Sequence, residues 1–392
     1  MVFTLKIGYV SRYPPVHCGV GEYTRLLVHG LKSVYPEAEI YILASTEAGE
    51  DSYIDREANV RIIPSFDRGE ASYERLLQVL NDIGGVDVLH VQHEYGIFGL
   101  NSGIARQVFN AKEAGLTKAV VFTMHTVYHV AGGREEAVKL QSMLSLADAV
   151  IIHSVLQEFE LQVQGVDPTR IRRIPHGTLI NPYLGYSRGM LSKKLGLGDL
   201  GGSFILATPG FLRYDKGLDL LIEALNNVES DAKLIIAGEK QAGYGYIDVE
   251  DENIILIERY LSGDEILALA ALADVIVLPY RDKPGKYSVS GILHLSMGSL
   301  KPIIGTRVPR LIELYEYAPR LTIPPRSVED LSSMIRWVKD NYDLAVSYTS
   351  NVYSYAASTQ WPRIAYSHLK LYRSLISKTR EKPVRPFLFD SK

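Results

Sequence analysis

Short runs of β-branched and other apolar residues alternate along the chain with stretches whose apolar positions have helical spacing. This alternation predicts parallel strands joined by crossover helices. In the first half of the sequence, the expected strands are residues 5–10, 39–43, 86–92, 119–124, 149–153 and 172–174.

A second strand series follows a stretch between residues 183 and 202 that is richer in glycine. We therefore expect one domain over residues 1–182 and another over residues 183–360. The strands expected in the second domain are residues 203–208, 233–238, 254–258, 274–279 and 302–305. In two such open α/β domains, ligands are expected at the carboxyl ends of the strands.

The composition limits the class of protein. A chain of 392 residues with 46% hydrophobic residues is long enough for two to three domains with buried cores. The formal charge of −3 predicts no general attraction to nucleic acid or anionic membranes. The single cysteine, Cys18, excludes an internal disulfide and a cysteine-rich zinc site, which favours a reducing compartment.

The pattern also indicates a cytoplasmic protein. No window approaches the roughly 20 apolar residues that span a bilayer, and the N-terminus does not resemble a cleaved signal peptide. A peripheral membrane contact stays open, because amphipathic docking patches can be short.

The loop after the first expected strand carries Gly19 and Gly21 at the start of a helix, where free backbone amides can face an anion or a sugar. A dinucleotide fingerprint would have a third small residue where this chain has Thr24, and an acidic residue after the second strand where it has Ser45. An NAD site is therefore disfavoured. The alternative for both glycines is a purely conformational role in a tight turn.

Polar residues follow two further strands of the first domain. His93 and Glu94 come after residues 86–92, and His125 comes after residues 119–124, so all three are expected at one edge of the sheet. A zinc-protease helix would continue with a second histidine where this chain has Ile97, which excludes that metal site. The alternative is that these side chains are packed or hydrogen-bonded beneath a loop.

The strongest signal lies between residues 203–208 and the next helix, where Arg213 and Lys216 occupy the loop and the first turn. Cations are unfavourable at a helix start, because the helix dipole is positive there. A diphosphate bound by both cations and by backbone amides explains their position. The alternative is two solvated loop charges.

A second anion site is expected where the chain continues from residues 274–279 into another helix. Ser290 and Gly291 place a hydroxyl and open amides at that helix start. The intervening Arg281, Lys283 and Lys286 can contribute, or they can be solvated loop cations.

In their order and spacing, these segments resemble a family 4 glycosyltransferase with the GT-B fold, over nearly the whole chain. The resemblance implies an α/β protein with two Rossmann-like domains facing across a cleft, the first holding an acceptor and the second a nucleotide-diphosphate sugar. It also implies a last helix, about residues 361–378, that returns to the first domain. The segments that carry it are residues 18–24, 123–126, 174–177, 210–224, 235–239, 271–281, 290–293, 301–308 and 359–366.

The resemblance implies that a hexose is transferred with retention of the anomeric configuration to a carbohydrate or lipid-linked acceptor. We expect neither a metal nor a cofactor, because cations and helix-start amides stand where a metal-dependent enzyme has carboxylates. His125 is then the catalytic residue beside the transferred sugar. The donor diphosphate is assigned to Arg213, Lys216, Gly19, Gly21, Ser290 and Gly291, the acceptor or sugar side to His93 and Glu94, and further donor contacts to Glu239, Tyr280 and His294.

The chain departs from the family pattern at two acidic positions. The two spaced glutamates of the family fall on Tyr287 and Leu295, so neither carboxylate is present. Two alternatives therefore stay open: a catalytically inactive sugar-nucleotide binding subunit, and a GT-B sugar phosphorylase or nucleotide-sugar epimerase. The donor sugar and base, the acceptor and the oligomeric state are also left open.

Overall fold

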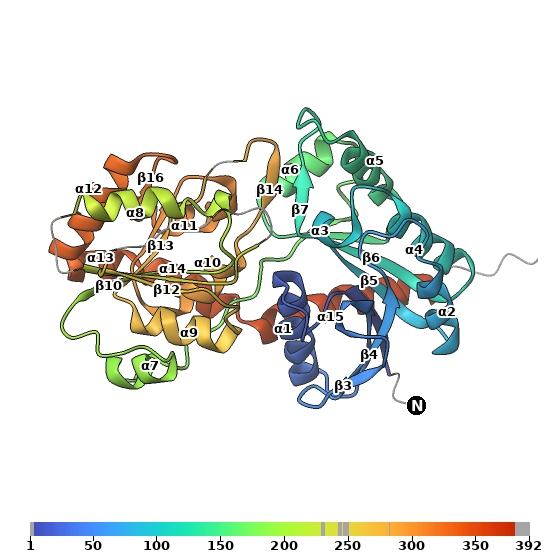
Figure 1. Cartoon of the computed structure of the whole chain (residues 1–392). Helices are drawn as coiled ribbons and strands as arrows, with labels where there is room; N and C mark the ends of the chain where they lie inside the picture. Colours follow the sequence, from blue (N-terminus) through green and yellow to red (C-terminus); the bar gives the residue numbers. More distant parts are fainter. Residues whose placement is uncertain (1–3, 229–231, 242–244, 246–250, 282, 381–392) are drawn as a thin grey trace, which may run out of the picture. The chain divides into compact units, whose positions relative to one another are not determined.

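The computed structural model describes residues 4–228, 232–241, 245, 251–281 and 283–380 (Figure 1). It divides the chain into two compact units. The first comprises the chain up to Ile152, Glu158–Ile174 and the chain from Pro362 onward, and the second comprises His153–Gln157 and Pro175–Trp361. The sequence placed the boundary at residues 182–183, somewhat later than the start of the long second segment.

The first unit is built on an eight-stranded sheet in the order β3-β4-β2-β1-β5-β6-β8-β9. The edge strand β3 is antiparallel to β4, and the other neighbouring strands are parallel. The strands of the unit are β1 (Lys6–Ser11), β2 (Glu39–Ser45), β3 (Tyr53–Asp55), β4 (Val60–Phe66), β5 (Val86–His93), β6 (Thr117–Met124), β7 (Thr126–Tyr128), β8 (Ala149–Ile152) and β9 (Ile171–Arg173). The helices are α1 (Gly19–Val34), α2 (Glu74–Asp82), α3 (Tyr95–Phe98), α4 (Gly103–Glu113), α5 (Glu135–Met143), α6 (Val155–Val163) and α15 (Trp361–Arg380).

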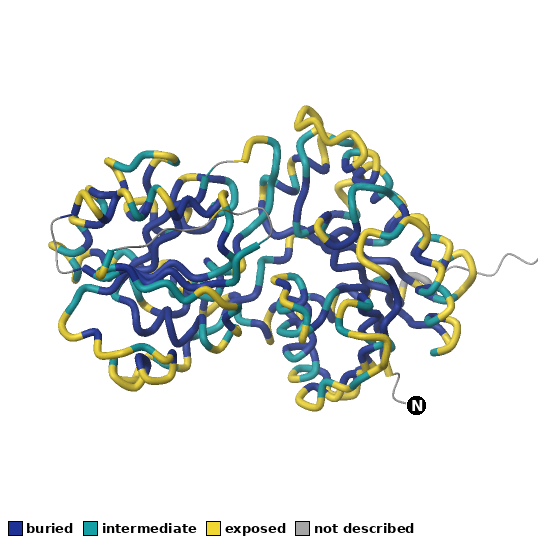
Figure 2. The backbone as a smooth tube through the Cα atoms, in the orientation of Figure 1, coloured by how far each residue is buried: buried dark blue, intermediate teal, exposed yellow. Residues whose placement is uncertain are grey.

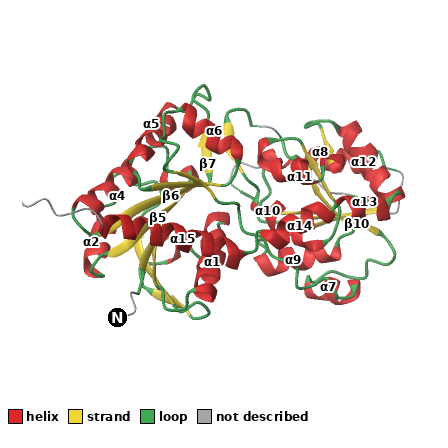
Figure 3. Ribbon diagram, turned by 180° about the vertical axis from the view of Figure 1, so that it is seen from behind, coloured by secondary structure: helices red, strands yellow, loops and turns green. Residues whose placement is uncertain are grey.

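Helices cover both faces of this sheet (Figure 3). Successive residues of a strand point to opposite faces, and β1 shows the consequence. Val10 joins the apolar cluster beneath α2 and α4, whereas the Tyr9 hydroxyl bonds the Tyr372 hydroxyl of α15 at 2.9 Å on the other face. The last helix of the chain thus packs against the first strand.

The second unit is built on a six-stranded parallel sheet in the order β12-β11-β10-β13-β15-β16. Its strands are β10 (Phe204–Pro209), β11 (Ala232–Ala237), β12 (Ile254–Ile257), β13 (Val275–Leu278), β14 (Lys286–Ser288), β15 (Ile303–Thr306) and β16 (Thr322–Ile323). Its helices are α7 (Arg188–Lys194), α8 (Leu218–Asn226), α9 (Gly263–Leu272), α10 (Gly291–Ser296), α11 (Ile312–Tyr317), α12 (Val328–Asp340), α13 (Tyr342–Tyr348) and α14 (Ser350–Ser358).

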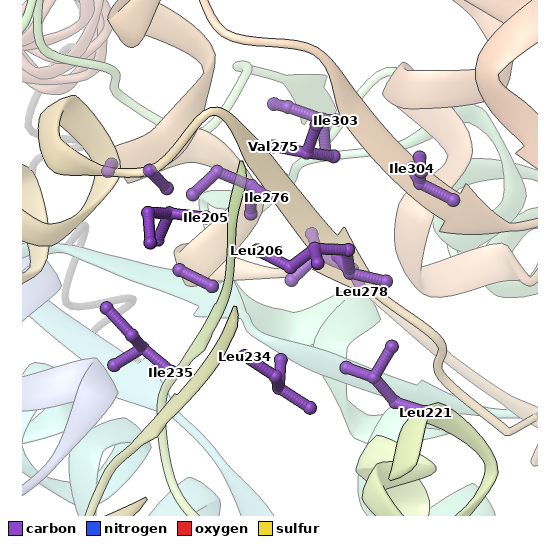
Figure 4. Close-up of a cluster of buried hydrophobic side chains, with 14 of the residues drawn as sticks. Ile205, Leu206, Leu221, Leu234, Ile235, Val275, Ile276, Leu278, Ile303 and Ile304 are labelled. Carbon is purple, nitrogen blue, oxygen red and sulfur yellow. The ribbon is translucent and has the colours of Figure 1, made fainter. Parts of the chain in front are cut away.

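The core of the second unit is formed by the apolar runs that predicted its strands. Leu206, Leu234, Ile276 and Ile304 come from four strands of the sheet and are fully buried (Figure 4). Leu221 of α8 packs into the same cluster. Burial on both faces explains why these strands consist of nearly continuous apolar residues (Figure 2).

Both sheets reverse their strand order at one point, between β1 and β5 in the first unit and between β10 and β13 in the second. The loops at the carboxyl ends of these neighbouring strands diverge, which leaves room for a ligand.

The predicted α/β class is confirmed. Among the described residues, no helix is long and apolar enough to cross a membrane.

Candidate functional site

The loop that follows β10 is fixed in place by two glycines. Gly210 has φ +110°, and a Cβ there would lie 2.8 Å from the Ile292 side chain. Gly217 has φ +66°, and a Cβ there would lie 2.1 Å from the Pro279 carbonyl oxygen. No other residue type fits these positions without displacing its neighbours. The loop is thereby held against the segment that follows β13, and Arg213 and Lys216 lie within it.

Lys216 is hydrogen-bonded to Tyr280, which is in turn within hydrogen-bond distance of Ser290; the sequence singled out all three residues. Its Nζ donates to the Tyr280 hydroxyl at 2.5 Å, and the Tyr280 and Ser290 hydroxyl oxygens are 3.2 Å apart. Ser290 also caps α10 by accepting a hydrogen bond from the Leu293 amide at 3.3 Å. Lys216 and Tyr280 are almost fully buried. These hydrogen bonds connect the loop before α8 with the start of α10, at the switch point of the second sheet.

Asp215, next to Lys216 in the sequence, forms ion pairs with three further cationic side chains. Its Oδ2 lies 3.1 Å from Arg213 Nη2, 2.9 Å from Arg310 Nη1 and 3.5 Å from Lys283 Nζ. Burial alone would raise the pKa of Asp215, but Arg213, Arg310, Lys283 and Lys216 lower it to about 2. The carboxylate is therefore charged at neutral pH and carries more positive charge around it than it can neutralise.

The same crowding affects Lys216. Burial lowers its pKa well below the ordinary value, and the neighbouring Arg310 and Arg213 lower it further. A bound anion would reverse the effect of those neighbours and favour the charged ammonium. The arrangement is thus suited to binding an anion, as the sequence predicted for Arg213 and Lys216.

Sequence reasoning missed Arg310, which lies in the single 3₁₀ turn Pro309–Leu311 shortly after β15. The only signal was its place after a buried strand of the parallel sheet, where a polar side chain reaches the same edge. Arg281, one of the loop cations, is paired with both oxygens of Asp219 and lies 4.1 Å from the Tyr214 ring centroid. It is therefore not a solvated charge.

The other donor-side candidates occupy less direct positions. The main-chain carbonyl of Glu239 accepts a hydrogen bond from the Leu212 amide at 2.9 Å. The main chain of Glu239 therefore lies beside the loop that contains Arg213. Gly291 begins α10, and a Cβ there would make only an ordinary contact of 3.8 Å with His176. Gly291 is therefore not required by packing, and its amide stands at the helix start next to Ser290.

His294 is packed inside the second unit, against Ser290 and His176. It is fully buried, its Nδ1 is 2.8 Å from the Ser290 carbonyl oxygen, and its ring centroid is 4.4 Å from that of His176. Burial lowers its pKa to about 4. The expectation that His294 contacts a nucleotide is therefore corrected, because the structure gives this side chain a place supporting Ser290 from within the unit.

In the first unit, His125 and Glu94 lie at the carboxyl edge of the sheet. His125 Nε2 is 3.0 Å from Gln92 Oε1, and the ring meets Tyr23 edge-on at 4.7 Å between centroids. The Glu94 carboxylate accepts a hydrogen bond from the Thr126 hydroxyl at 2.7 Å. Both side chains are only partly buried, so neither is confined to a packing role.

His93 is a packed histidine, which corrects its expected place on the acceptor or sugar side. It is fully buried between Phe98, stacked at 5.4 Å, and Tyr95, edge-on at 4.8 Å. Neither ring nitrogen has a hydrogen-bond partner among the described residues, and burial lowers its pKa to about 3. The side chain is therefore neutral and held in aromatic surroundings.

The two glycines at the start of α1 differ from each other. A Cβ on Gly21 would lie 3.3 Å from the Arg12 carbonyl carbon, whereas a Cβ on Gly19 would meet nothing within 4 Å. Gly21 is thus favoured by packing of the loop, while packing does not require a glycine at position 19. Among the described residues, no group of three or more His, Cys, Asp and Glu side chains could hold a metal ion.

Two family models match the chain. Glycosyltransferase Family 4 matches residues 18–178, and Glycosyl transferases group 1 matches residues 203–341. The chain is a glycosyltransferase. The family 4 match covers the edge with His125 and Glu94, and the group 1 match covers the cation cluster of Asp215. A search among curated proteins found no match.

Several solved structures share the fold at low identity. Anabaena HepE in complex with UDP-glucose is 15% identical, with a TM-score of 0.71 over 94% of this chain and 100% of that one. The UDP-forming α,α-trehalose-phosphate synthase of Burkholderia vietnamiensis is 10% identical, with a TM-score of 0.71 over 95% and 99%. WaaG, a glycosyltransferase of lipopolysaccharide biosynthesis, is 13% identical, with a TM-score of 0.64 over 93% and 99%. The GT-B fold with two Rossmann-like domains is thereby confirmed.

Proposed function

We propose that this glycosyltransferase moves a hexose from UDP-hexose to a carbohydrate or lipid-linked acceptor, with retention of configuration and without a metal. The observation that carries the proposal is the buried series of side-chain hydrogen bonds from Lys216 through Tyr280 to Ser290, with Arg213 beside it. These groups stand at the switch point of a parallel sheet, where nucleotides bind in folds of this kind.

The cluster suits the chemistry of the leaving group. Departure of UDP places negative charge on the outer phosphate, and fixed cations and helix-start amides stabilise that charge without reorganising. Lys216 is held by Tyr280, and Arg213 is held by Asp215, so both donors are fixed before the substrate arrives. The starts of α8 and α10 add the positive ends of two helix dipoles.

UDP is chosen as the nucleotide because structural relatives use it. HepE is solved in complex with UDP-glucose, and the trehalose-phosphate synthase of similar fold is described as UDP-forming. In the first unit, His125 is the proposed catalytic residue. Its Nε2 contact with Gln92 fixes the ring at the sheet edge, which suits a role in orienting the sugar or stabilising charge.

A binding experiment with Lys216→Ala tests the proposal. The variant should bind UDP about 10 to 160 times more weakly than the wild type, because a charge-assisted hydrogen bond contributes about 1.5–3 kcal/mol. Uridine affinity should change little, since uridine has no phosphate. Isothermal titration calorimetry measures both ligands, with Lys193→Ala on the exposed side of α7 as the control. Equal losses for UDP and uridine would contradict the assignment.

Metal independence has its own test. Transfer should continue in excess chelator, because the described cluster supplies positive charge to the leaving diphosphate. Modest stimulation by Mg²⁺ is compatible with this proposal, since the ion also binds free UDP. Complete loss of transfer in chelator, restored by added metal, would show that the cluster does not suffice.

A further inference from the structure

A small pocket opens beside the cation cluster in the second unit. It lies between the loop that leads into β14 and the turn after β15, and its volume is about 20 Å³. This is room for one oxygen atom of a carboxylate or phosphate group, with the rest of the ligand outside, and not for a sugar ring. The pocket is lined by Asp215, Arg281, Lys283, Lys286, Ser288, Val308, Pro309 and Arg310.

The lining differs from the residues assigned to the donor diphosphate. Lys216, Tyr280 and Ser290 do not line the pocket, whereas Lys283 and Arg310 do. Asp215 belongs to both groups, since it lines the pocket and holds Arg213. The pocket and the proposed diphosphate site are therefore neighbours that share one carboxylate.

One polar group of the pocket lacks a hydrogen-bond acceptor. Arg310 Nε is buried and has no hydrogen-bond partner among the described residues, although Nη1 of the same guanidinium bonds Asp215. A buried guanidinium donor without a partner is costly, so a ligand oxygen at this place would be stabilising. Lys283 Nζ lies 3.5 Å from Asp215, and its side chain is half exposed, so it can turn toward a ligand.

The net charge of the side chains that line the pocket also favours an anionic ligand. Asp215 is the one carboxylate among the described residues that line the pocket, and four cationic side chains line it as well. Asp219 neutralises Arg281. Asp215 is shared between Arg310, Lys283 and Arg213, so it cannot neutralise all three.

We infer that this pocket binds a carboxylate or phosphate group of a substrate, separate from the donor diphosphate. The inference rests on the proposed function and narrows its substrate class to molecules with a second anionic group. That group belongs either to the transferred sugar, as in a uronic acid, or to the acceptor, as in a sugar phosphate. Arg310 and Lys283 are its ligands.

The test compares matched neutral and anionic compounds by calorimetry. The donor arm measures UDP-glucose against UDP-glucuronate, and the acceptor arm measures glucose against glucose 6-phosphate with UDP present. In one arm, the anionic compound should bind at least about ten times more tightly than its neutral partner. Lys283→Gln and Arg310→Gln should each remove most of that preference, and Lys193→Gln, an exposed substitution on α7, should retain it.

Two results would overturn the inference: no anionic preference in either arm, or a preference that persists in both pocket variants. If Arg310→Gln does not fold, Lys283→Gln still gives the comparison, because Lys283 is half exposed. UDP binding by the wild type and its loss in Lys216→Ala report on the proposed function separately. A protein that binds UDP through Lys216 but shows no anionic preference would retain the proposed function and lose this inference.

Discussion

Replacing Asp215 by asparagine should destabilise the free protein and strengthen its response to UDP. The carboxylate is almost fully buried and contacts Arg213, Arg310 and Lys283. Asparagine keeps the shape of the side chain and removes the charge. The three cations then lack their shared counter-charge, and a diphosphate bound beside Arg213 supplies part of it instead.

The magnitude follows from the pKa of Asp215, which the neighbouring cations lower from 3.8 to about 2 against the opposing effect of burial. At 1.36 kcal/mol per pKa unit, this corresponds to about 2 kcal/mol. Because the pKa in the folded state lies below the ordinary value, this stability is fully present above about pH 4. It is lost as the pH falls toward 2.

Urea denaturation and thermal unfolding measure both effects. At pH 7, Asp215→Asn should lose about 2 kcal/mol, or roughly 4–8 °C in melting temperature for a domain of this size. Saturating UDP should raise the melting temperature of the variant more than that of the wild type. Asp219→Asn is the control, since its pair with Arg281 is largely exposed on the carboxylate side and should contribute less than about 1 kcal/mol.

The reasoning fails if Asp215→Asn is as stable as the wild type at pH 7. It also fails if UDP stabilises both proteins equally. The first result would show that the carboxylate does not hold the cations together. The second would show that UDP does not take over its electrostatic role.

Three further substitutions test other parts of the site. His125→Ala should lower turnover at least about tenfold and leave UDP affinity within about twofold, and unchanged turnover in the folded variant would give His125 a packing role. His93→Phe should retain activity and change the free energy of unfolding by less than about 1 kcal/mol, because both ring nitrogens lack hydrogen-bond partners among the described residues. Loss of turnover in this variant would refute the packing role of His93. Gly217→Ala should unfold at lower temperature than Gly196→Ala, since both have positive φ but only Gly217 meets a carbonyl oxygen at 2.1 Å, and equal melting temperatures would contradict the steric argument.

The strands with continuous apolar runs could be predicted from the sequence. Residues 119–124 and 274–279, for example, correspond to most of β6 and to β13. The β4 strand, Val60–Phe66, was not predicted. It contains Pro64, which cannot donate to a ladder, and its place in the sheet depends on parallel pairing with β2. Strands as short as β14 and β16 carry too few residues for a pattern.

For the site, the sequence could place Arg213, Lys216 and Ser290 near one another, because parallel strands bring their carboxyl ends to one edge. It could not reveal that Asp215 pairs with Arg213, or that Arg310 is a member of the cluster. Arg310 bonds Asp215 across 95 positions of the chain, and no local pattern carries such a contact. The roles of His93 and His294 were equally hidden, since burial of a polar ring depends on neighbours from other elements.

Asp215 connects stability with binding in this site. A cluster of cations that is suited to anionic groups of a substrate repels itself when no ligand is bound, and burial of Lys216 increases the cost. One internal carboxylate reduces that repulsion while leaving positive charge in excess, so anionic ligand groups are still attracted. An apolar residue at this position would leave the cations unpaired, and a second carboxylate would compete with the ligand. A single aspartate shared by Arg213, Arg310 and Lys283 therefore lets the free protein keep the cations in place for the substrate.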